Sequence, residues 1–212
     1  GEYVAQLTKG KEILTPKANL ICLELLSKND CDRVKKRLNL WLLDRINQML
    51  GSLNKLRSDQ FSGLLKGICF RLVENLGTLP RPIIQREIGL LTRSDRKTLK
   101  LEGVTIGQHS IFIKGSLEPE ILKFRSILWV LYKEEVLMLS NFLLDQAPEF
   151  VRGRFPSNYL NAIGYRNVGG VAIRVDIIER ISALAWKLGG KTPFVIDRDL
   201  LSLVGCSVEE MT

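Results

Sequence analysis

Apolar residues recur at helical spacing in two long stretches near the start of the chain. Over residues 32–51 they fall within one arc of a helical wheel, with Asp32 placed as an N-cap and Gly51 at the end. Over residues 61–77 the three-and-four spacing is nearly unbroken, and Gly77 follows the last apolar residue. The pattern predicts two amphipathic helices that form an antiparallel hairpin through a short loop.

Weaker patterns surround these helices. Residues 1–30 predict a linker or extended arm that ends in a short helix over 19–26. A polar helix capped by Ser94 is expected over 94–101. In GVTIGQHSIFIKG, residues 103–115, apolar and polar positions alternate, which predicts a small β-hairpin. Glu118-Pro119-Glu120 then marks the first turn of another amphipathic helix.

The last part of the chain has a different organisation. Residues 145–157 contain two prolines and a glycine and are predicted to be a linker. A short helix over 158–163, a strand over 170–175 and a helix capped by Asp176 are expected next. Two short helical stretches follow the Gly-Gly pair. This order predicts a helix-turn-helix or winged-helix unit over 158–212, which we expect to be truncated inside its third helix.

Together these elements predict a mainly α fold. A helical bundle with a small β-hairpin insertion is followed by a small helix-turn-helix-like or winged-helix-like unit. The predicted divisions are an arm at 1–30, a helical accessory domain at 31–144, a linker at 145–157 and a truncated helix-turn-helix-like unit at 158–212.

The net charge of +8 lies in the first half of the chain. Residues 1–100 hold 19 Lys and Arg against 10 Asp and Glu, a net +9, whereas residues 101–212 hold 12 against 13, a net −1. A basic half beside a neutral half is typical of a surface that faces nucleic acid. A solubilising patch has the same composition, so charge alone leaves both interpretations open.

Nine cationic residues are the candidate nucleic-acid contacts. The first cluster stands at the predicted start of a helix, where positive charge opposes the helix dipole, so a compensating phosphate or acidic partner is expected. The second cluster has no interleaved aromatic residues and does not indicate base stacking. Near the final strand, phosphate contact and ion pairing with Asp176 or Glu179 are both open. Arg45, inside an apolar arc, is expected to be buried and paired. The nine are Arg33, Lys35, Lys36, Arg37, Arg93, Arg96, Lys97, Arg166 and Arg174.

The sequence lacks a recognisable catalytic or metal-binding motif. Its four cysteines are scattered and accompany one histidine, His109, so neither a zinc site nor a disulfide framework is indicated and a reduced, cytoplasmic chain is expected. The GGKT segment at 189–192 lacks the preceding strand that a phosphate loop needs. Charges interrupt the most apolar stretch, 127–144, which argues against a membrane-spanning helix. We expect no catalytic residue, metal site or cofactor in this chain, and no membrane partner.

Four segments resemble, in the same order, the region after the motor core of bacterial DExH-type helicases. This family is chiefly alphaproteobacterial and is related to the mitochondrial degradosome RNA helicase. The resemblance runs from about Arg33 to the end of the chain. The segments are ICFRLVENLGTL, GVTIGQHSIFIKGSLEPEILKFRSILW, AIGYRNVGGVAIRVDIIERISAL and LLSLVGCSVEEM.

The resemblance implies a parent protein that is an ATP-dependent superfamily-two helicase with two RecA-like domains. ATP and Mg would bind to the phosphate loop and DExH box of those domains, and neither motif occurs in this chain. The corresponding region of the family is largely helical, frames the exit of the unwound strand and offers partner surfaces. The implied function is to bind or guide nucleic acid, with single-stranded RNA as the expected partner, beside motor domains in cis.

Two other functions remain open. The same basic face fits a protein–protein adaptor of the helicase, for example toward a nuclease. A DNA-binding regulator built on the final unit would require duplex specificity and a dimer with defined half-site spacing. The neutral charge of the second half argues against this regulator.

Overall fold

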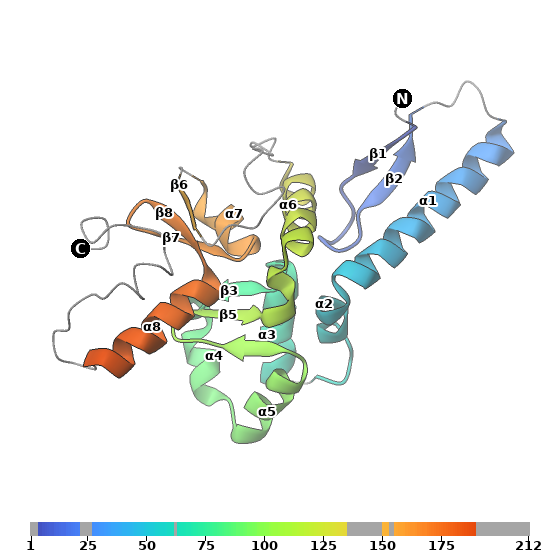
Figure 1. Cartoon of the computed structure of the whole chain (residues 1–212). Coiled ribbons are helices and arrows are strands. Elements are labelled where there is room, and N and C mark those ends of the chain that lie inside the picture. The colour runs from blue at the N-terminus through green and yellow to red at the C-terminus, as the bar shows by residue number, and fades with distance from the viewer. Residues whose placement is uncertain (1–3, 22–26, 62, 135–149, 153–154, 190–212) are drawn as a thin grey trace.

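A computed structural model describes residues 4–21, 27–61, 63–134, 150–152 and 155–189 (Figure 1). Helices account for 61% of these residues, and the strands form three small antiparallel sheets. The chain is a mixed α/β fold, so the predicted mainly α bundle with one hairpin insertion is wrong. Several of the strands have only three or four residues and show no clear alternation in the sequence.

The elements are named here in chain order. The helices are α1 (Lys28–Met49), α2 (Gly51–Leu56), α3 (Gly63–Glu74), α4 (Gln85–Leu90), α5 (Arg93–Leu101), α6 (Pro119–Lys133), α7 (Ser157–Ala162) and α8 (Val175–Gly189), with 3-10 turns η1 (Arg81–Ile84) and η2 (Lys114–Leu117). The strands are β1 (Ala5–Thr8), β2 (Lys17–Leu20), β3 (Thr78–Pro80), β4 (Val104–Ile106), β5 (Ser110–Ile113), β6 (Phe150–Arg152), β7 (Tyr165–Val168) and β8 (Val171–Arg174).

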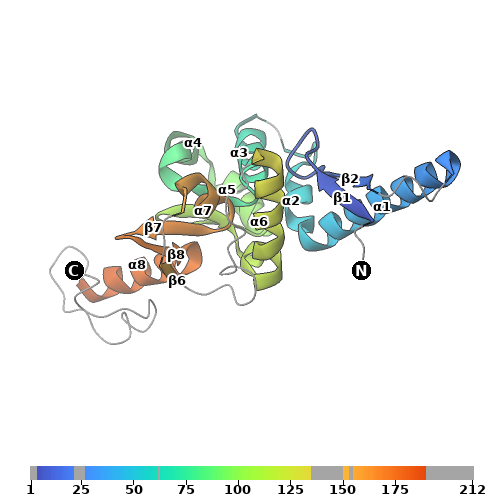
Figure 2. The ribbon, with the colours of Figure 1, turned by 90° about the horizontal axis from the view of Figure 1, so that it is seen from above.

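The β1–β2 hairpin and α1 form an arm that projects from the rest of the molecule (Figures 1 and 2). The Asn39 side chain of α1 fixes the hairpin, because it accepts a hydrogen bond from the Ala18 N–H (3.0 Å) and donates one to the Ala18 carbonyl (3.1 Å). A hairpin therefore replaces much of the predicted linker or extended arm. Of the helix expected over 19–26, residues 19–20 belong to β2, and 22–26 lie outside the described residues.

α1 confirms the first predicted helix but begins earlier than expected. Its N-cap is Ser27, whose hydroxyl accepts a hydrogen bond from the Asp30 N–H, and not Asp32. Leu42 and Ile46 are its buried residues and pack with the hairpin. Arg45 was expected to be buried and paired and is instead exposed.

α3 confirms the second predicted helix, but it packs against the short α2 and not against α1. The long helix ends at Leu50, whose backbone leaves the helical region (φ −122°, ψ 29°), and this redirects the chain into α2. Gly77 follows the end of α3 as predicted. Its N–H donates to the Leu72 carbonyl (2.7 Å) at a φ of +96°, a conformation that favours glycine.

The β3–β5–β4 sheet lies in the middle of the body (Figure 1). β4 and β5 confirm the predicted hairpin, and β3 pairs with the free edge of β5. All four residues of β5 are buried. One hydrophobic core extends from Ile13 in the hairpin loop to Val175 at the start of α8, and so continues past the linker predicted at 145–157.

α5 and α6 confirm two further predicted helices. The N-cap of α5 is Thr92 and not Ser94, and it forms a capping box with Asp95. Hydrogen bonds from Thr92 lower the pKa of the Asp95 carboxyl. α6 starts at Pro119, as the sequence predicts.

The last elements correct the prediction of a helix-turn-helix-like unit. α7, β8 and α8 occur where a helix, a strand and a helix were expected. β7 was not expected, and it pairs with β8 around a turn in which Gly169 and Gly170 have positive φ. β6, within the predicted linker, pairs with the other edge of β8.

Where one strand was expected between the two helices, β7 and β8 form a hairpin, and β6 completes a three-stranded sheet with them. The two short helices expected after Gly189 fall in residues 190–212, which lie outside the described residues, as do positions 145–149 and 153–154 of the predicted linker.

Candidate nucleic-acid interface

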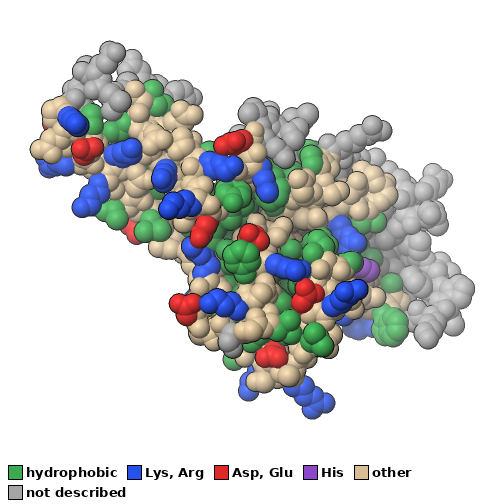
Figure 3. Space-filling model, turned by 180° about the vertical axis from the view of Figure 1, so that it is seen from behind, with side chains coloured by type: hydrophobic (Ala, Val, Ile, Leu, Met, Phe, Trp, Pro, Cys, Tyr) green, Lys and Arg blue, Asp and Glu red, His purple; other side chains and the backbone are tan. Residues whose placement is uncertain are grey.

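The first predicted cluster lies on the projecting arm. Arg33, Lys35, Lys36 and Arg37 are all exposed on α1, and Figure 3 shows Lys and Arg side chains along this arm. Arg33 lies 3.6 Å from the Asp30 carboxylate, an exposed pair of small energetic value. Among the described residues, the other three have no ion-pair partner. They therefore remain available to an external anion.

The helix dipole does not explain this cluster. Because α1 begins at Lys28, Lys35 to Arg37 lie about two turns inside the helix, beyond the first turn where the dipole acts. Ser27 and Asp30 already satisfy the helix start. The electrostatic penalty at the helix start, which an anionic partner was expected to compensate, is therefore absent. A ligand is indicated only because these cations are exposed and because Lys35, Lys36 and Arg37 have no ion-pair partner among the described residues.

Apolar side chains accompany these cations on the open side of α1. Leu40, Trp41 and Leu43 are 48%, 61% and 49% exposed. Leu40 and Leu43 widen the apolar arc in the sequence, which predicts a helix covered on more than one side, and within the described residues that prediction is wrong. The arm presents cationic and apolar side chains together.

The second predicted cluster lies on α5. Arg93 and Lys97 are exposed and separated by one helical turn. Arg96 has a structural contact, because its Nη2 donates to the Ile88 carbonyl at the end of α4 (2.6 Å). Arg93 and Lys97 are thus the better candidates for an external phosphate.

Arg166 and Arg174 have different surroundings although they lie on paired strands. Arg174 forms a bidentate pair with Asp176, with Nε to Oδ1 at 2.7 Å and Nη2 to Oδ2 at 3.0 Å. Ion pairing with Asp176 was one of the two interpretations left open for Arg174, and the structure contains this pair. Arg166 donates from Nη1 to the His109 carbonyl (3.1 Å).

The structure places a second arginine beside Arg166. Arg81 donates from Nη1 to the Gly107 carbonyl (2.8 Å) and from its main-chain N–H to the His109 carbonyl (2.9 Å). The two arginines, with Gln85 and His109, line a shallow hollow of about 310 Å³. Two guanidinium groups at one hollow form a site that suits a phosphate. We call this the Arg81–Arg166 hollow.

Glu179 of α8 holds the turn on which this hollow is built. Its carboxylate accepts hydrogen bonds from three consecutive main-chain N–H groups, those of Gln108 (2.6 Å), His109 (2.8 Å) and Ser110 (2.8 Å). A Cβ at Gly107 would collide with this carboxylate, so glycine permits the close approach. Glu179 thus holds a turn that lies some 70 positions earlier in the sequence.

The three predicted groups do not converge on one site. α1 lies at one end of the molecule, β7 and β8 lie toward the other end, and α5 lies at the base of the body (Figures 1 and 2). Sequence reasoning missed Arg81 and the supporting role of Glu179. No local signal marks either residue, since both act through contacts to a distant turn.

Two kinds of feature are absent from the described residues. No group of three or more His, Cys, Asp or Glu side chains there is placed to hold a metal ion. In the same part of the chain, no helix is both long and apolar enough to cross a membrane.

Comparisons with protein-family models, with curated proteins and with solved structures find no match to this chain. The resemblance to DExH-type helicases therefore stays a proposal, and the function is argued from the surface itself.

Proposed function

We propose that this chain is an accessory region that binds and guides single-stranded RNA for an ATP-dependent DExH-type helicase in the cytoplasm. The observation that carries the proposal is the row of exposed cations on α1, where Lys35, Lys36 and Arg37 have no ion-pair partner among the described residues. An arm that projects from the body can lie along a strand without obstruction (Figure 1).

Phosphate binding accounts for such a surface in physical terms. Cations that neutralise backbone phosphates release condensed counterions, and this supplies sequence-independent affinity. The Arg81–Arg166 hollow offers a second, more rigid phosphate contact on the body. ATP binding and hydrolysis belong, in this proposal, to motor domains in cis, and no catalytic step is assigned to this chain.

Charge reversal on the arm tests the proposal. Lys36→Glu/Arg37→Glu should weaken binding of a fluorescent single-stranded RNA at least tenfold at low salt, because attraction to phosphates becomes repulsion. The matched control is Lys114→Glu/Lys187→Glu, which reverses two exposed lysines elsewhere. Equal affinities for the two double variants would contradict a role for the arm.

A protein–protein adaptor is the second candidate function. The exposed Leu40, Trp41 and Leu43 favour it, since several exposed apolar side chains close together on one helix are typical of a partner surface. An acidic protein partner such as a nuclease subunit would suit the neighbouring cations. Leu40→Ser/Leu43→Ser should abolish capture of such a partner while RNA affinity stays unchanged.

A further inference from the structure

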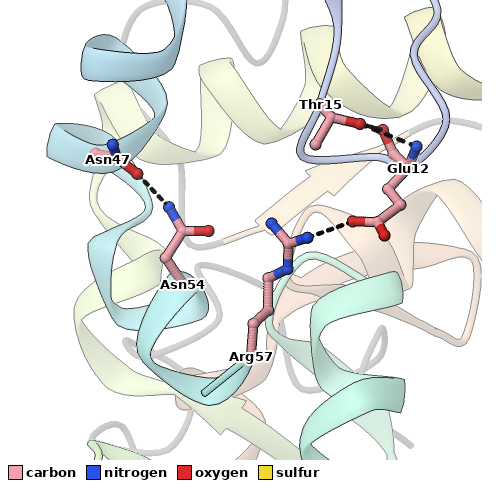
Figure 4. Close-up of polar contacts among 5 residues, drawn as sticks. All are labelled: Glu12, Thr15, Asn47, Asn54 and Arg57. Atoms are coloured by element: carbon pink, nitrogen blue, oxygen red, sulfur yellow. Dashed lines mark hydrogen bonds and ion pairs between the residues drawn. The ribbon is translucent and has the colours of Figure 1, made fainter. Parts of the chain in front are cut away.

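A cleft lies between the β1–β2 hairpin loop, α3 and the end of α6. Its volume is about 510 Å³, which falls in the range of small-ligand sites. One wall is tied down by polar contacts, shown in Figure 4. Arg57 pairs with Glu12 of the hairpin loop (2.5 Å), and the Thr15 hydroxyl accepts from the Glu12 N–H (3.0 Å) and donates to its carbonyl (3.1 Å). These contacts hold the hairpin loop beside the end of α2, through an exposed ion pair of small energetic value.

Three aromatic side chains line this cleft. Phe70 is 61% exposed, an unusual position for a phenylalanine, whereas Trp129 is only 4% exposed. Tyr132 is the third. Aromatic surfaces at a cleft bind planar rings by stacking, and this binding tolerates any base.

Two buried polar groups of the cleft have no partner within the described residues. They are the indole N–H of Trp129 and the hydroxyl of Ser58. A buried donor without an acceptor costs free energy, and the indole N–H can only donate. Both atoms are themselves shielded from solvent, so neither reaches a ligand in the cleft unless its side chain moves.

Lysine ammonium groups lie beside the aromatic wall, although Glu74 also lines the cleft and Lys9 pairs with Glu134 (3.8 Å). The Lys133 ammonium lies 5.1 Å from the centroid of the Trp129 ring and 5.8 Å from that of Tyr132, and the Lys9 ammonium lies 5.2 Å from the Tyr132 centroid. Lys11 also lines the cleft. Among described residues, neither Lys11 nor Lys133 has an ion-pair partner. Ammonium groups beside stacking surfaces match a phosphate attached to a base.

We propose that this cleft binds one nucleotide of a single-stranded RNA. The base stacks against Phe70 and Tyr132, beside the Trp129 side chain that also lines the cleft. Lys11 and Lys133 contact its phosphate. The inference rests on the proposed function, and it adds a site at which one base is held apart from its neighbours. An acidic peptide would use the lysines but leave the aromatic wall without a role.

The test uses Trp129 as its own reporter. Trp41→Phe/Trp186→Phe leaves Trp129 as the only tryptophan of the three in the chain. We expect saturable quenching of its fluorescence by adenosine 5′-monophosphate and none by inorganic phosphate. In this background, Phe70→Ala and Lys133→Ala should each weaken binding about tenfold.

Matched controls keep the result interpretable. Leu101→Ala removes an exposed apolar side chain outside the cleft, and Lys55→Ala removes an exposed lysine outside it. Both should leave the nucleotide affinity unchanged. Because Phe70 is exposed, its truncation should not unfold the chain, and urea unfolding of each variant verifies this.

Each outcome decides between the two proposals. If RNA binds through the arm but adenosine monophosphate does not quench Trp129, and the cleft variants leave RNA affinity unchanged, the cleft inference is wrong and the proposed function stands. If the nucleotide quenches Trp129 while the α1 reversal leaves RNA affinity unchanged, the cleft inference stands and the arm does not guide the strand. If hexaglutamate quenches Trp129 and the nucleotide does not, the cleft takes an acidic peptide and the inference is overturned.

Discussion

Arg125 donates two hydrogen bonds to the main-chain carbonyl of Ala162, from Nε (2.9 Å) and from Nη2 (2.5 Å), and so joins α6 to the end of α7. Its other donors reach the Ser116 carbonyl (2.9 Å), the Ser116 hydroxyl (3.1 Å) and the Thr78 hydroxyl (2.7 Å). Arg125 is fully buried, and every acceptor is neutral. Burial lowers the pKa of this guanidinium to about 9, so it stays charged at neutral pH.

Arg125→Met should destabilise the fold strongly. The change removes five hydrogen bonds and leaves buried acceptors of Thr78, Ser116 and Ala162 without a donor, which should cost about 3 kcal/mol or more in the free energy of unfolding. Urea unfolding measures this as a lower midpoint. The matched control Arg45→Met changes an exposed arginine and should stay within about 0.5 kcal/mol of the parent chain. Similar midpoints for both variants would refute the bridging role of Arg125.

Glu179→Gln should loosen the turn at residues 108–110. The neutral amide keeps the shape but offers one acceptor oxygen in place of two charged ones, so the three N–H donors lose about 1–3 kcal/mol of interaction. Amide hydrogen exchange should accelerate at Gln108, His109 and Ser110. Glu120→Gln, an exposed carboxylate on α6, is the control and should leave these rates unchanged. Unchanged exchange in Glu179→Gln would argue against the contact.

Cys69 should make the fold less stable in mild alkali. Burial raises the pKa of its thiol from 9.0 to about 11. Above pH 9 the unfolded chain releases this proton while the folded chain retains it, so stability falls as pH rises from about 9 to 11.

Cys69→Ala removes that contribution, and it tests the assignment by difference. Whatever cavity the variant creates costs the same at every pH, so its stability relative to the parent chain should rise by about 2 kcal/mol between pH 9 and 11. Other groups that titrate in this pH range are present in both chains, so their effects on stability cancel in the difference. A difference that does not change with pH would show that Cys69 does not titrate in this way.

The sequence predicted helices well where amphipathic periodicity is long. α1, α3 and α6 each run for twelve or more residues, so several turns repeat the apolar spacing. β3, β6 and β7 were missed, although β4 and β5, which are equally short, were predicted because they lie together in one alternating stretch. β3 pairs with β5 some thirty positions later and β6 pairs with β8 some twenty positions later, whereas β7 pairs with the adjacent β8. Tertiary pairing, which local pattern does not contain, decides such strands.

From the sequence, the candidate site residues could be predicted only as exposed charged positions. The α1 cluster is a run in the sequence, and its side chains are exposed in the structure. The Arg81–Arg166 hollow joins positions 85 residues apart, and the cleft joins Glu12, Phe70 and Trp129. The helical spacing that predicts α3 leaves Phe70 outside the apolar arc, and Trp129 belongs to the hydrophobic core. Their placement at a cleft follows from how the hairpin loop and α6 pack, which no local rule specifies.

The salt dependence of single-stranded RNA binding tests the central claim most directly. Each phosphate neutralised on a single strand contributes a slope of about −0.7 to the logarithm of affinity against the logarithm of salt. If the arm contacts phosphates, the parent chain should show a steep slope. Lys36→Glu/Arg37→Glu should reduce its magnitude by about 1.4, since two contacts are lost. Lys114→Glu/Lys187→Glu should keep the parent slope. A flat dependence in the parent chain, or the same slope in both double variants, would contradict the account.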